Sequence, residues 1–357
     1  MSTLENYGVL FPTSVVGSMP RSDFVRELVL EDIPSGHDGA ALDAAVAYVI
    51  ALQEGTGLDV ITDGEWRRAS YIGIIAELAH GFEVGTHPED GRPWTVVTDK
   101  LSPKNPGAVV REARFLKAHS RTPIKVTLPA PALLGERLWD PERSAAAYPK
   151  RRDFVAACVP ILRREAELLR DEGVHVIQID DPHLCLLVDP QVRSSYADPD
   201  AEADFSVAMI NEMVQGIDGV RLAVHLCRRA GARVRGEAHH AGGYDPILGA
   251  LNRLAVHHLT LEFTEPGADD ARILQQLRPD LEIGLGCVNV TPGRIDTPEI
   301  IVERVEGALE HVAPQRLVLN PDCGFAPGSA ARVDMDEVYS KLKNLREAAH
   351  RLRARYG

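Results

Sequence analysis

A histidine and a cysteine lie two positions apart at the end of an apolar run, in the segment RLAVHLCRR at residues 221–229. In an extended chain, successive side chains point to opposite faces, so His225 and Cys227 share one face while the leucines and valine around them share the other. The apolar face suits packing in a core, whereas an imidazole and a thiol together are ligands that zinc prefers. By itself the pair is more typical of a buried, hydrogen-bonded histidine, so the interpretation depends on further ligands.

Two later segments supply residues of the kind a metal site needs. Alternation along HLTLEF places Glu262 on the face opposite its leucine neighbours, and an inward carboxylate in a core requires a partner. The run RLVLNPDCG ends in a third candidate, and together these residues form a set of donors whose thiols favour zinc over magnesium or calcium: His225, Cys227, Glu262 and Cys323. Taken alone, Cys323 is equally a small core residue, and Cys287, near the end of another run, is an alternative ligand.

Short apolar or β-branched runs alternate with longer amphipathic segments along the chain. Eight runs predict buried strands, at residues 13–18, 58–63, 123–131, 174–181, 221–227, 258–263, 281–289 and 316–324. The segments between and after them predict helices at 40–55, 150–173, 201–217, 296–312 and 334–357. Eight strands alternating with helices indicate an α/β protein of the (β/α)₈ barrel type, which we expect to form one catalytic domain over residues 1–357.

Three segments are longer than the connections of a minimal barrel and predict inserted βα loops. Residues 82–105 predict a hairpin or a long loop, and residues 182–200 and 228–243 follow the fourth and fifth strands. In such barrels the active site lies at the C-terminal ends of the strands. Because carboxylates, imidazoles and thiols gather at the predicted strand ends, we expect the active site at the rim formed by the C-terminal ends of the strands.

Composition narrows the class of partner and the compartment. The formal net charge of −13 argues against binding to nucleic acid or to an anionic membrane surface. No segment has the apolar pattern that a membrane span or a secretory signal requires. The five cysteines are odd in number and scattered, which is not the pattern of a disulfide framework. We therefore expect a cytoplasmic protein that acts on a small molecule.

In combination, these motifs resemble the catalytic domain of the cobalamin-independent methionine synthases. HLC, LTLEF and NPDCGF are similar to the zinc-binding signature of that family, and GSMP, GLDVITDGEWRR and IQIDDP are similar to its other segments, in the same order. The resemblance extends from about residue 13 to residue 328. By length the chain is similar to single-domain members, which lack the N-terminal half of the long enzymes.

The resemblance implies a zinc-dependent methyltransferase that transfers a methyl group to the thiol of homocysteine or a similar amino acid thiol, giving methionine. It implies that His225, Cys227, Glu262 and Cys323 bind Zn²⁺ and that the substrate sulfur joins them as a thiolate. A thiolate, and not a thiol, is the nucleophile in such a transfer. Glu262 is then expected to act in catalysis by giving up its place to the substrate sulfur.

The resemblance also assigns the other groups of the thiol substrate. Gly17 and Ser18 are expected to hold its carboxylate, since backbone N–H and hydroxyl groups suit an anion. Glu65 and Asp180 are expected to hold its ammonium group. Asp180, expected also to act in catalysis, and Asp181 complete the substrate site from the IQIDDP segment.

Some positions depart from the family pattern or have a simpler interpretation. Asn289 stands where methionine synthases have the aspartate of a D-I-H-S-P motif, and the histidine of that motif, which helps to protonate the leaving folate, has no counterpart nearby. Asp181 stands where the family usually has glutamate. Glu65 is also compatible with a helix-start carboxylate paired with Arg67 or Arg68.

The methyl donor therefore stays open, with a methyl-folate and a corrinoid protein as candidates. A second hypothesis is a zinc alkyltransferase that adds a thiol to an epoxide, like the epoxyalkane:coenzyme M transferases. A third is a zinc-binding barrel without catalysis. The carboxylate pair Glu65 and Asp180 favours an amino acid thiol, because coenzyme M has no amine for it to bind.

Overall fold

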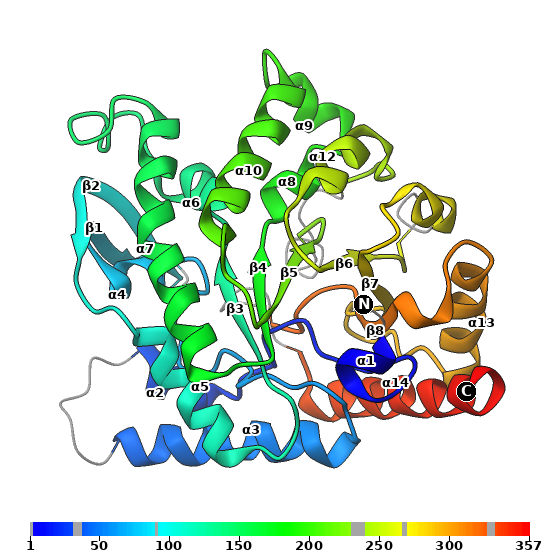
Figure 1. The fold of residues 1–357 in the computed structure, drawn as a ribbon. Coiled ribbons are helices and arrows are strands. Elements are labelled where there is room, and N and C mark those ends of the chain that lie inside the picture. The colour runs from blue at the N-terminus through cyan, green and yellow to red at the C-terminus, as the bar shows by residue number, and fades with distance from the viewer. Residues whose placement is uncertain (1–2, 31–37, 90–91, 230–239, 266–269, 327–332) are drawn as a thin grey trace.

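The computed structural model shows a (β/α)₈ barrel, with parallel strands at its centre and helices around them (Figure 1). It describes residues 3–30, 38–89, 92–229, 240–265, 270–326 and 333–357. Six strands form a parallel sheet in chain order: β3 (Lys125–Pro129), β4 (Val176–Asp180), β5 (Arg221–Leu226), β6 (His258–Glu262), β7 (Glu282–Val288) and β8 (Leu317–Pro321). Both faces of these strands are covered, as their continuous apolar sequence predicts.

Two short segments close the barrel between β8 and β3. Isolated parallel bridges join Thr13 to Leu319, Ser14 to Val60, and Ile61 to Ile124. The prediction of full strands at 13–18 and 58–63 is therefore wrong in extent, although both segments lie in the barrel wall. The Asp59 side chain gives the reason, because its Oδ2 accepts the Thr13 backbone N–H at 2.7 Å and so replaces a ladder hydrogen bond.

Helices form the outer layer. The longer ones are α3 (Asp38–Thr56), α5 (Ala108–His119), α7 (Arg151–Glu172), α10 (Pro199–Val214), α13 (Pro298–Leu309) and α14 (Met335–Tyr356). The N-terminal α3 and the C-terminal α14 pack side by side along one side of the barrel (Figure 1). None of the described helices has the length and apolar composition needed to cross a membrane.

The βα connections carry a hairpin and several short helices. The hairpin pairs β1 (Ala79–Thr86) with β2 (Pro93–Pro103) in antiparallel register and lies beside α7 (Figure 1). The short helices are α2 (Asp23–Leu30), α4 (Ile75–Leu78), α6 (Pro131–Leu138), α8 (Pro182–Leu186), α9 (Pro190–Ser194), η1 (Asp245–Ile247), α12 (Leu248–Arg253), η2 (Ala271–Gln276) and η3 (Pro314–Arg316). Most of the predicted insertion at 228–243 lies outside the described residues.

The N-terminal end of the barrel is filled by structural contacts. Helix α1 (Thr3–Tyr7) covers it, and the side-chain amide of Asn6 donates a hydrogen bond to Glu282 at the start of β7. Glu282 also pairs with Arg221 at the start of β5, at 2.5 Å. A buried carboxylate with two such partners belongs to the fold, which leaves the opposite end of the barrel for chemistry.

Candidate active site

A carboxylate on β4 orients an imidazole on β5. Asp180 and His225 are register partners in the parallel pair, and His225 Nδ1 lies 3.0 Å from Asp180 Oδ1. Nδ1 therefore donates its proton to Asp180 in a hydrogen bond, and Nε2 is the nitrogen that offers a lone pair to a metal ion once it has lost its proton. Nε2 is buried and forms no hydrogen bond with any residue that the structure describes. A buried nitrogen in this state requires a ligand.

Two cysteine sulfurs lie close to that nitrogen. Cys227 directly follows β5 and Cys323 comes two residues after β8, and their sulfurs are 3.3 Å apart. The ligand atoms of His225, Cys227 and Cys323 all lie within 4.8 Å of one another, and we call these residues the His–Cys–Cys group. The partnerless imidazole nitrogen and the two sulfurs form a set of three donors that fits a zinc ion.

The charges of the His–Cys–Cys group also suit a cation. The hydrogen bond from the Cys323 thiol lowers the pKa of Cys227 well below its ordinary value, and the nearby His225 imidazolium lowers it further against the effect of burial. Burial lowers the pKa of His225, but the Cys227 thiolate and the Asp180 carboxylate outweigh burial and raise this pKa to about 10. A thiolate held in the protein interior is the form that binds a metal.

Glu262 lies beside the His–Cys–Cys group and is not a member of it. It ends β6 and is fully buried, and its Oε2 accepts the backbone N–H of Arg228 at 2.9 Å. Its own backbone N–H donates to the Tyr244 hydroxyl at 2.8 Å. The structure thus brings together three of the four predicted metal ligands, and ligation by Glu262 stays a prediction.

A cavity of about 370 Å³ opens at this rim. Its wall contains the whole His–Cys–Cys group and four of the predicted substrate-binding residues: Gly17, Ser18, Glu65 and Asp180. Small-molecule sites in proteins typically have volumes of roughly 300–1,000 Å³. The cavity is therefore large enough for an amino acid next to the candidate metal ligands.

Glu65 presents a buried carboxylate to this cavity. Its backbone is left-handed, with φ of 58°, and Thr127 donates a hydrogen bond of 2.7 Å to its Oε1. Burial raises the pKa of Glu65, while the Arg68 guanidinium acts in the opposite direction. Arg67 and Arg68 form ion pairs with carboxylates other than Glu65, so the simpler pairing considered from the sequence is absent from the described residues. A bound cation would offset the burial of this carboxylate.

The turn at Gly17 makes room for the Glu65 carboxylate. A Cβ atom at position 17 would lie 2.7 Å from Glu65 Oε1 and 3.1 Å from a methyl carbon of Thr127. The next residue, Ser18, accepts the backbone N–H of Ala326 at 3.3 Å and so holds the loop after β8 against the first barrel segment. The absence of a side chain at position 17 therefore lets a carboxylate approach the backbone of this turn.

Two other residues considered from the sequence serve the fold. Asp181 is the N-cap of α8, where its carboxylate accepts the Leu184 backbone N–H at 3.0 Å and the Ser206 hydroxyl, and it is not in the cavity wall. Cys287 donates to the Asn320 carbonyl, and burial raises its pKa to about 12. It is also outside the His–Cys–Cys group. The structure thus shows Asp181 in a capping role, and its predicted contact with the substrate stays a prediction.

Several groups in the cavity wall had no role assigned from the sequence. Arg21, Tyr71 and His183 all line the cavity. Arg21 donates a hydrogen bond to the Glu65 carbonyl, and burial raises the pKa of Tyr71 well above its ordinary value. A local signal exists for His183, because it follows the acidic end of β4 by a few residues. Arg21 and Tyr71 lie in loops whose path the sequence pattern does not predict.

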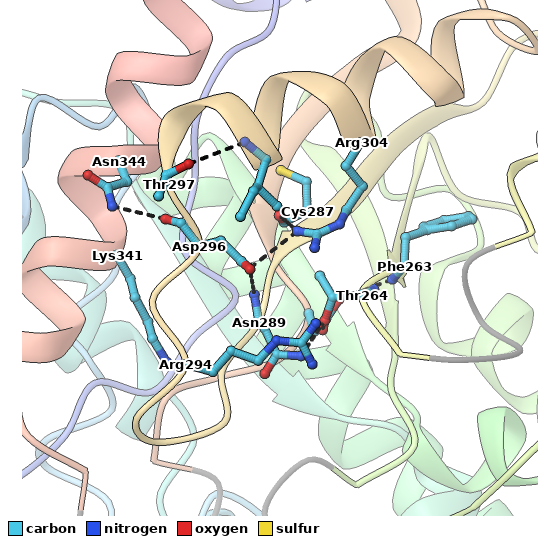
Figure 2. Close-up of polar contacts among 12 residues, drawn as sticks. Phe263, Thr264, Cys287, Asn289, Arg294, Asp296, Thr297, Arg304, Lys341 and Asn344 are labelled. Atoms are coloured by element: carbon cyan, nitrogen blue, oxygen red, sulfur yellow. Dashed lines mark hydrogen bonds and ion pairs between the residues drawn. The ribbon is translucent and has the colours of Figure 1, made fainter.

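Asn289 connects the loops after β6 and β7. Figure 2 shows its side chain near Thr264 and its backbone next to Asp296. Its Nδ2 donates to Thr264 Oγ1 at 2.7 Å and to Glu265 Oε1 at 2.6 Å, while its Oδ1 accepts the Thr291 N–H at 2.8 Å. Asn289 is not in the cavity wall, and both its Nδ2 and its Oδ1 form hydrogen bonds within the loops. This position therefore stabilises the barrel rim.

The family of the chain follows from a match over nearly its whole length. The family model "Cobalamin-independent synthase, Catalytic domain" matches residues 11–351. The chain belongs to this family. A methionine synthase from Sulfolobus acidocaldarius is 27% identical over 333 residues, which cover 88% of this chain and 86% of that protein. A methionine synthase from Pyrococcus horikoshii is 27% identical over 354 residues, which cover 96% and 93% of the two chains. The resemblance expected from the motifs is confirmed.

Solved structures of B12-independent methionine synthases have the same fold as this family member. The enzyme from Shewanella sp. W3-18-1, in complex with selenomethionine, superposes with a TM-score of 0.77 at 20% identity and covers 97% of this chain and 99% of its own. The putative enzyme from Listeria monocytogenes superposes with a TM-score of 0.71 at 24% identity, with coverages of 96% and 98%. The predicted (β/α)₈ barrel is thereby confirmed.

Proposed function

We propose that this member of the cobalamin-independent synthase family transfers a methyl group to the thiol of homocysteine, or of a similar amino acid, and so produces methionine. The observation that carries the proposal is one cavity that combines the His–Cys–Cys group with the buried carboxylates of Glu65 and Asp180. The His–Cys–Cys group suits a metal ion that binds a sulfur nucleophile, and the two carboxylates suit an ammonium group.

We further propose that the cofactor is zinc. His225, Cys227 and Cys323 would hold the ion, with Glu262 as the candidate fourth ligand. Bound there, zinc supplies the positive charge that keeps a substrate thiol ionised at neutral pH. Asp180 holds the His225 ring in the orientation that directs Nε2 toward the two sulfurs. Glu262 is held by the Arg228 backbone next to Cys227, close to the ligands it would join.

The remaining polar groups would orient the amino acid. Glu65 and Asp180 would bind the ammonium group, whose charge offsets the burial that raises the pKa of Glu65. The Gly17–Ser18 turn would bind the carboxylate through its backbone and hydroxyl groups. With both ends fixed, the substrate sulfur is directed toward the His–Cys–Cys group and the remaining cavity is left for the methyl donor.

A direct test is to load the protein with zinc and add homocysteine together with one donor at a time. The donors are methyltetrahydrofolate monoglutamate, methylcobalamin and a simple epoxide, and mass spectrometry identifies the product. We expect methionine from at least one methyl donor. Reaction with the epoxide alone would replace the proposal by a thiol alkyltransferase. The absence of any product from a protein with stoichiometric zinc would support a barrel without catalysis.

A further inference from the structure

His183 lies in the same cavity as the His–Cys–Cys group and has no function in the reaction described so far. It is the second residue of α8, directly after the strand that carries Asp180. Its Nε2 lies 3.2 Å from Oε1 of Glu202 on α10, and its Nδ1 forms no hydrogen bond within the described part of the chain. One imidazole nitrogen is thus held by a carboxylate, and the other is left for a ligand, as in a general acid–base pair.

The carboxylate that holds His183 is itself fixed. Glu202 pairs with Arg151 at 2.6 Å and with Arg152 at 3.1 Å, both on α7. Burial works against the charged form of Glu202, but hydrogen bonds from His183 and Arg151 outweigh it and lower this pKa to about 2. Glu202 therefore stays ionised across the physiological range, and its position does not depend on a bound substrate.

The charges around His183 favour its protonated form. Burial lowers the pKa of His183, yet Glu202 on α10, Asp181 at the start of α8 and Glu136 on α6 outweigh burial and raise it above the ordinary value. The ring of Tyr196 meets the imidazole edge to face with centroids 6.0 Å apart and adds no charge. The resulting imidazolium can donate a proton at neutral pH.

The other described imidazoles in the cavity wall are less suited to donate a proton. His225 belongs to the His–Cys–Cys group, and its Nδ1 is used by Asp180. His87 is on the hairpin loop, with a side chain that is 43% exposed and a contact of 3.5 Å to Glu89. His183, in contrast, is a buried histidine that the buried carboxylate of Glu202 orients, and it is not a candidate metal ligand.

We propose that His183 is the catalytic acid that protonates the leaving group of the methyl donor, an inference that rests on the proposed methyl transfer. The thiolate sulfur forms a bond to the methyl carbon while the carbon–nitrogen bond of a methylated amine breaks. The electron pair of that bond stays on nitrogen, which takes the proton from His183 Nδ1. The proton lost by the substrate thiol restores the imidazolium over the cycle. In sum, a thiol and a methylated amine give a thioether and an amine.

The test compares two donors that differ in their need for a proton. Methyltetrahydrofolate leaves as an amine nitrogen that must be protonated, whereas methylcobalamin leaves as cob(I)alamin, which keeps the electron pair of the cobalt–carbon bond. In single turnovers with homocysteine, we expect His183→Asn to lower the rate with methyltetrahydrofolate by about 10²-fold or more and to change the rate with methylcobalamin by less than about 3-fold. His183→Gln provides a second variant, and His350→Asn, at an exposed histidine of α14, is the surface control.

Several outcomes would overturn the role of His183. Equal losses of rate with both donors in His183→Asn would indicate a structural role. A loss of rate in His87→Asn that is confined to methyltetrahydrofolate would identify His87, on the hairpin, as the acid instead. Wild-type turnover with methylcobalamin alone would leave the proposed methyl transfer standing and remove the need for an acid. A wild-type protein that uses neither donor would instead contradict the proposed function itself.

A pH profile separates proton donation from simple positioning. With methyltetrahydrofolate, the wild-type rate should fall as the pH rises through the pKa of His183, since the acid is then lost. Glu202→Gln removes a carboxylate that raises this pKa, so the fall should move to lower pH. With methylcobalamin, the pH dependence of the rate should be the same in Glu202→Gln as in the wild type. An unchanged profile in Glu202→Gln would contradict the proposal.

Discussion

The imidazole of His225 and the carboxylate of Asp180 stand side by side on neighbouring strands, paired in register with Nδ1 3.0 Å from Oδ1. The side-chain amide of Gln178 donates to the same Oδ1 at 2.8 Å. Because both contacts use one oxygen, Oδ2 is left for the ammonium group that we propose Asp180 binds. A single carboxylate would thereby link the orientation of a candidate metal ligand to the proposed binding of the amino acid.

Asp180→Asn should weaken zinc binding. The amide keeps the shape of the side chain but loses the charge that orients and polarises His225, and loss of such a partner typically lowers metal affinity by about 10- to 100-fold. Competition with a chromophoric chelator measures the change. Glu65→Gln is the matched control, since Glu65 lines the same cavity without contacting a member of the His–Cys–Cys group. Equal zinc affinities in the wild type and Asp180→Asn would contradict the link.

Glu65→Gln should instead weaken binding of the amine. We expect about a 10- to 100-fold loss of affinity for homocysteine, because a charge-assisted hydrogen bond to its ammonium group becomes a neutral one. The affinity for 4-mercaptobutyrate, which lacks the amine, should change little. Titration of the cobalt-substituted protein, followed by its visible absorption, measures both. Parallel losses for the two thiols would show that Glu65 acts on the sulfur end or on the fold.

The strands β3 to β8 could be predicted from the sequence because each is a short apolar run buried on both faces. The shared face of His225 and Cys227 followed from strand periodicity, and the rim position of Cys323 followed from its place at the end of a predicted strand. The two closing segments could not be predicted in the same way. Their register depends on the Asp59 side chain, which takes the place of a ladder acceptor for Thr13.

The two acidic residues at the end of β4 show where sequence reasoning could have gone further. Asp181 precedes a proline that starts a helix, and aspartate followed by proline is typical of an N-cap. That signal predicts the capping role of Asp181 and leaves Asp180 for the site. The pairing of His183 with Glu202 had no such local signal, because it joins α8 to a helix that begins more than ten residues later.

Cys323→Ser and Cys287→Ser should separate a metal ligand from a core thiol. Both cysteines are buried near strand ends, but only Cys323 lies in the His–Cys–Cys group. A hydroxyl is a poor replacement for a zinc thiolate, so Cys323→Ser should lose most bound zinc. Cys287→Ser should keep it. Metal analysis of the purified proteins gives both stoichiometries, and zinc loss in Cys287→Ser alone would contradict the assignment.

Lys125 should make the stability of the fold rise with pH. Its side chain is buried inside the barrel, where Nζ donates to the Val15 carbonyl at 2.7 Å. Burial lowers the pKa of Lys125 to about 7, although the Asp180 carboxylate acts in the opposite direction. Since the unfolded chain keeps this lysine protonated up to about pH 10.4, it binds more protons than the folded protein between these values, and the free energy of unfolding increases with pH.

Lys125→Met removes this titration and keeps an unbranched side chain of similar length. Between pH 7 and pH 9, Lys125 should add about 2 kcal/mol to the free energy of unfolding of the wild type, and this increment should be missing from the variant. Urea denaturation of both metal-free proteins at the two pH values measures it, with Lys343→Met, at an exposed lysine of α14, as the control for loss of one charge. An identical pH dependence in the wild type and Lys125→Met would mean that the buried amine is charged equally in the folded and unfolded states.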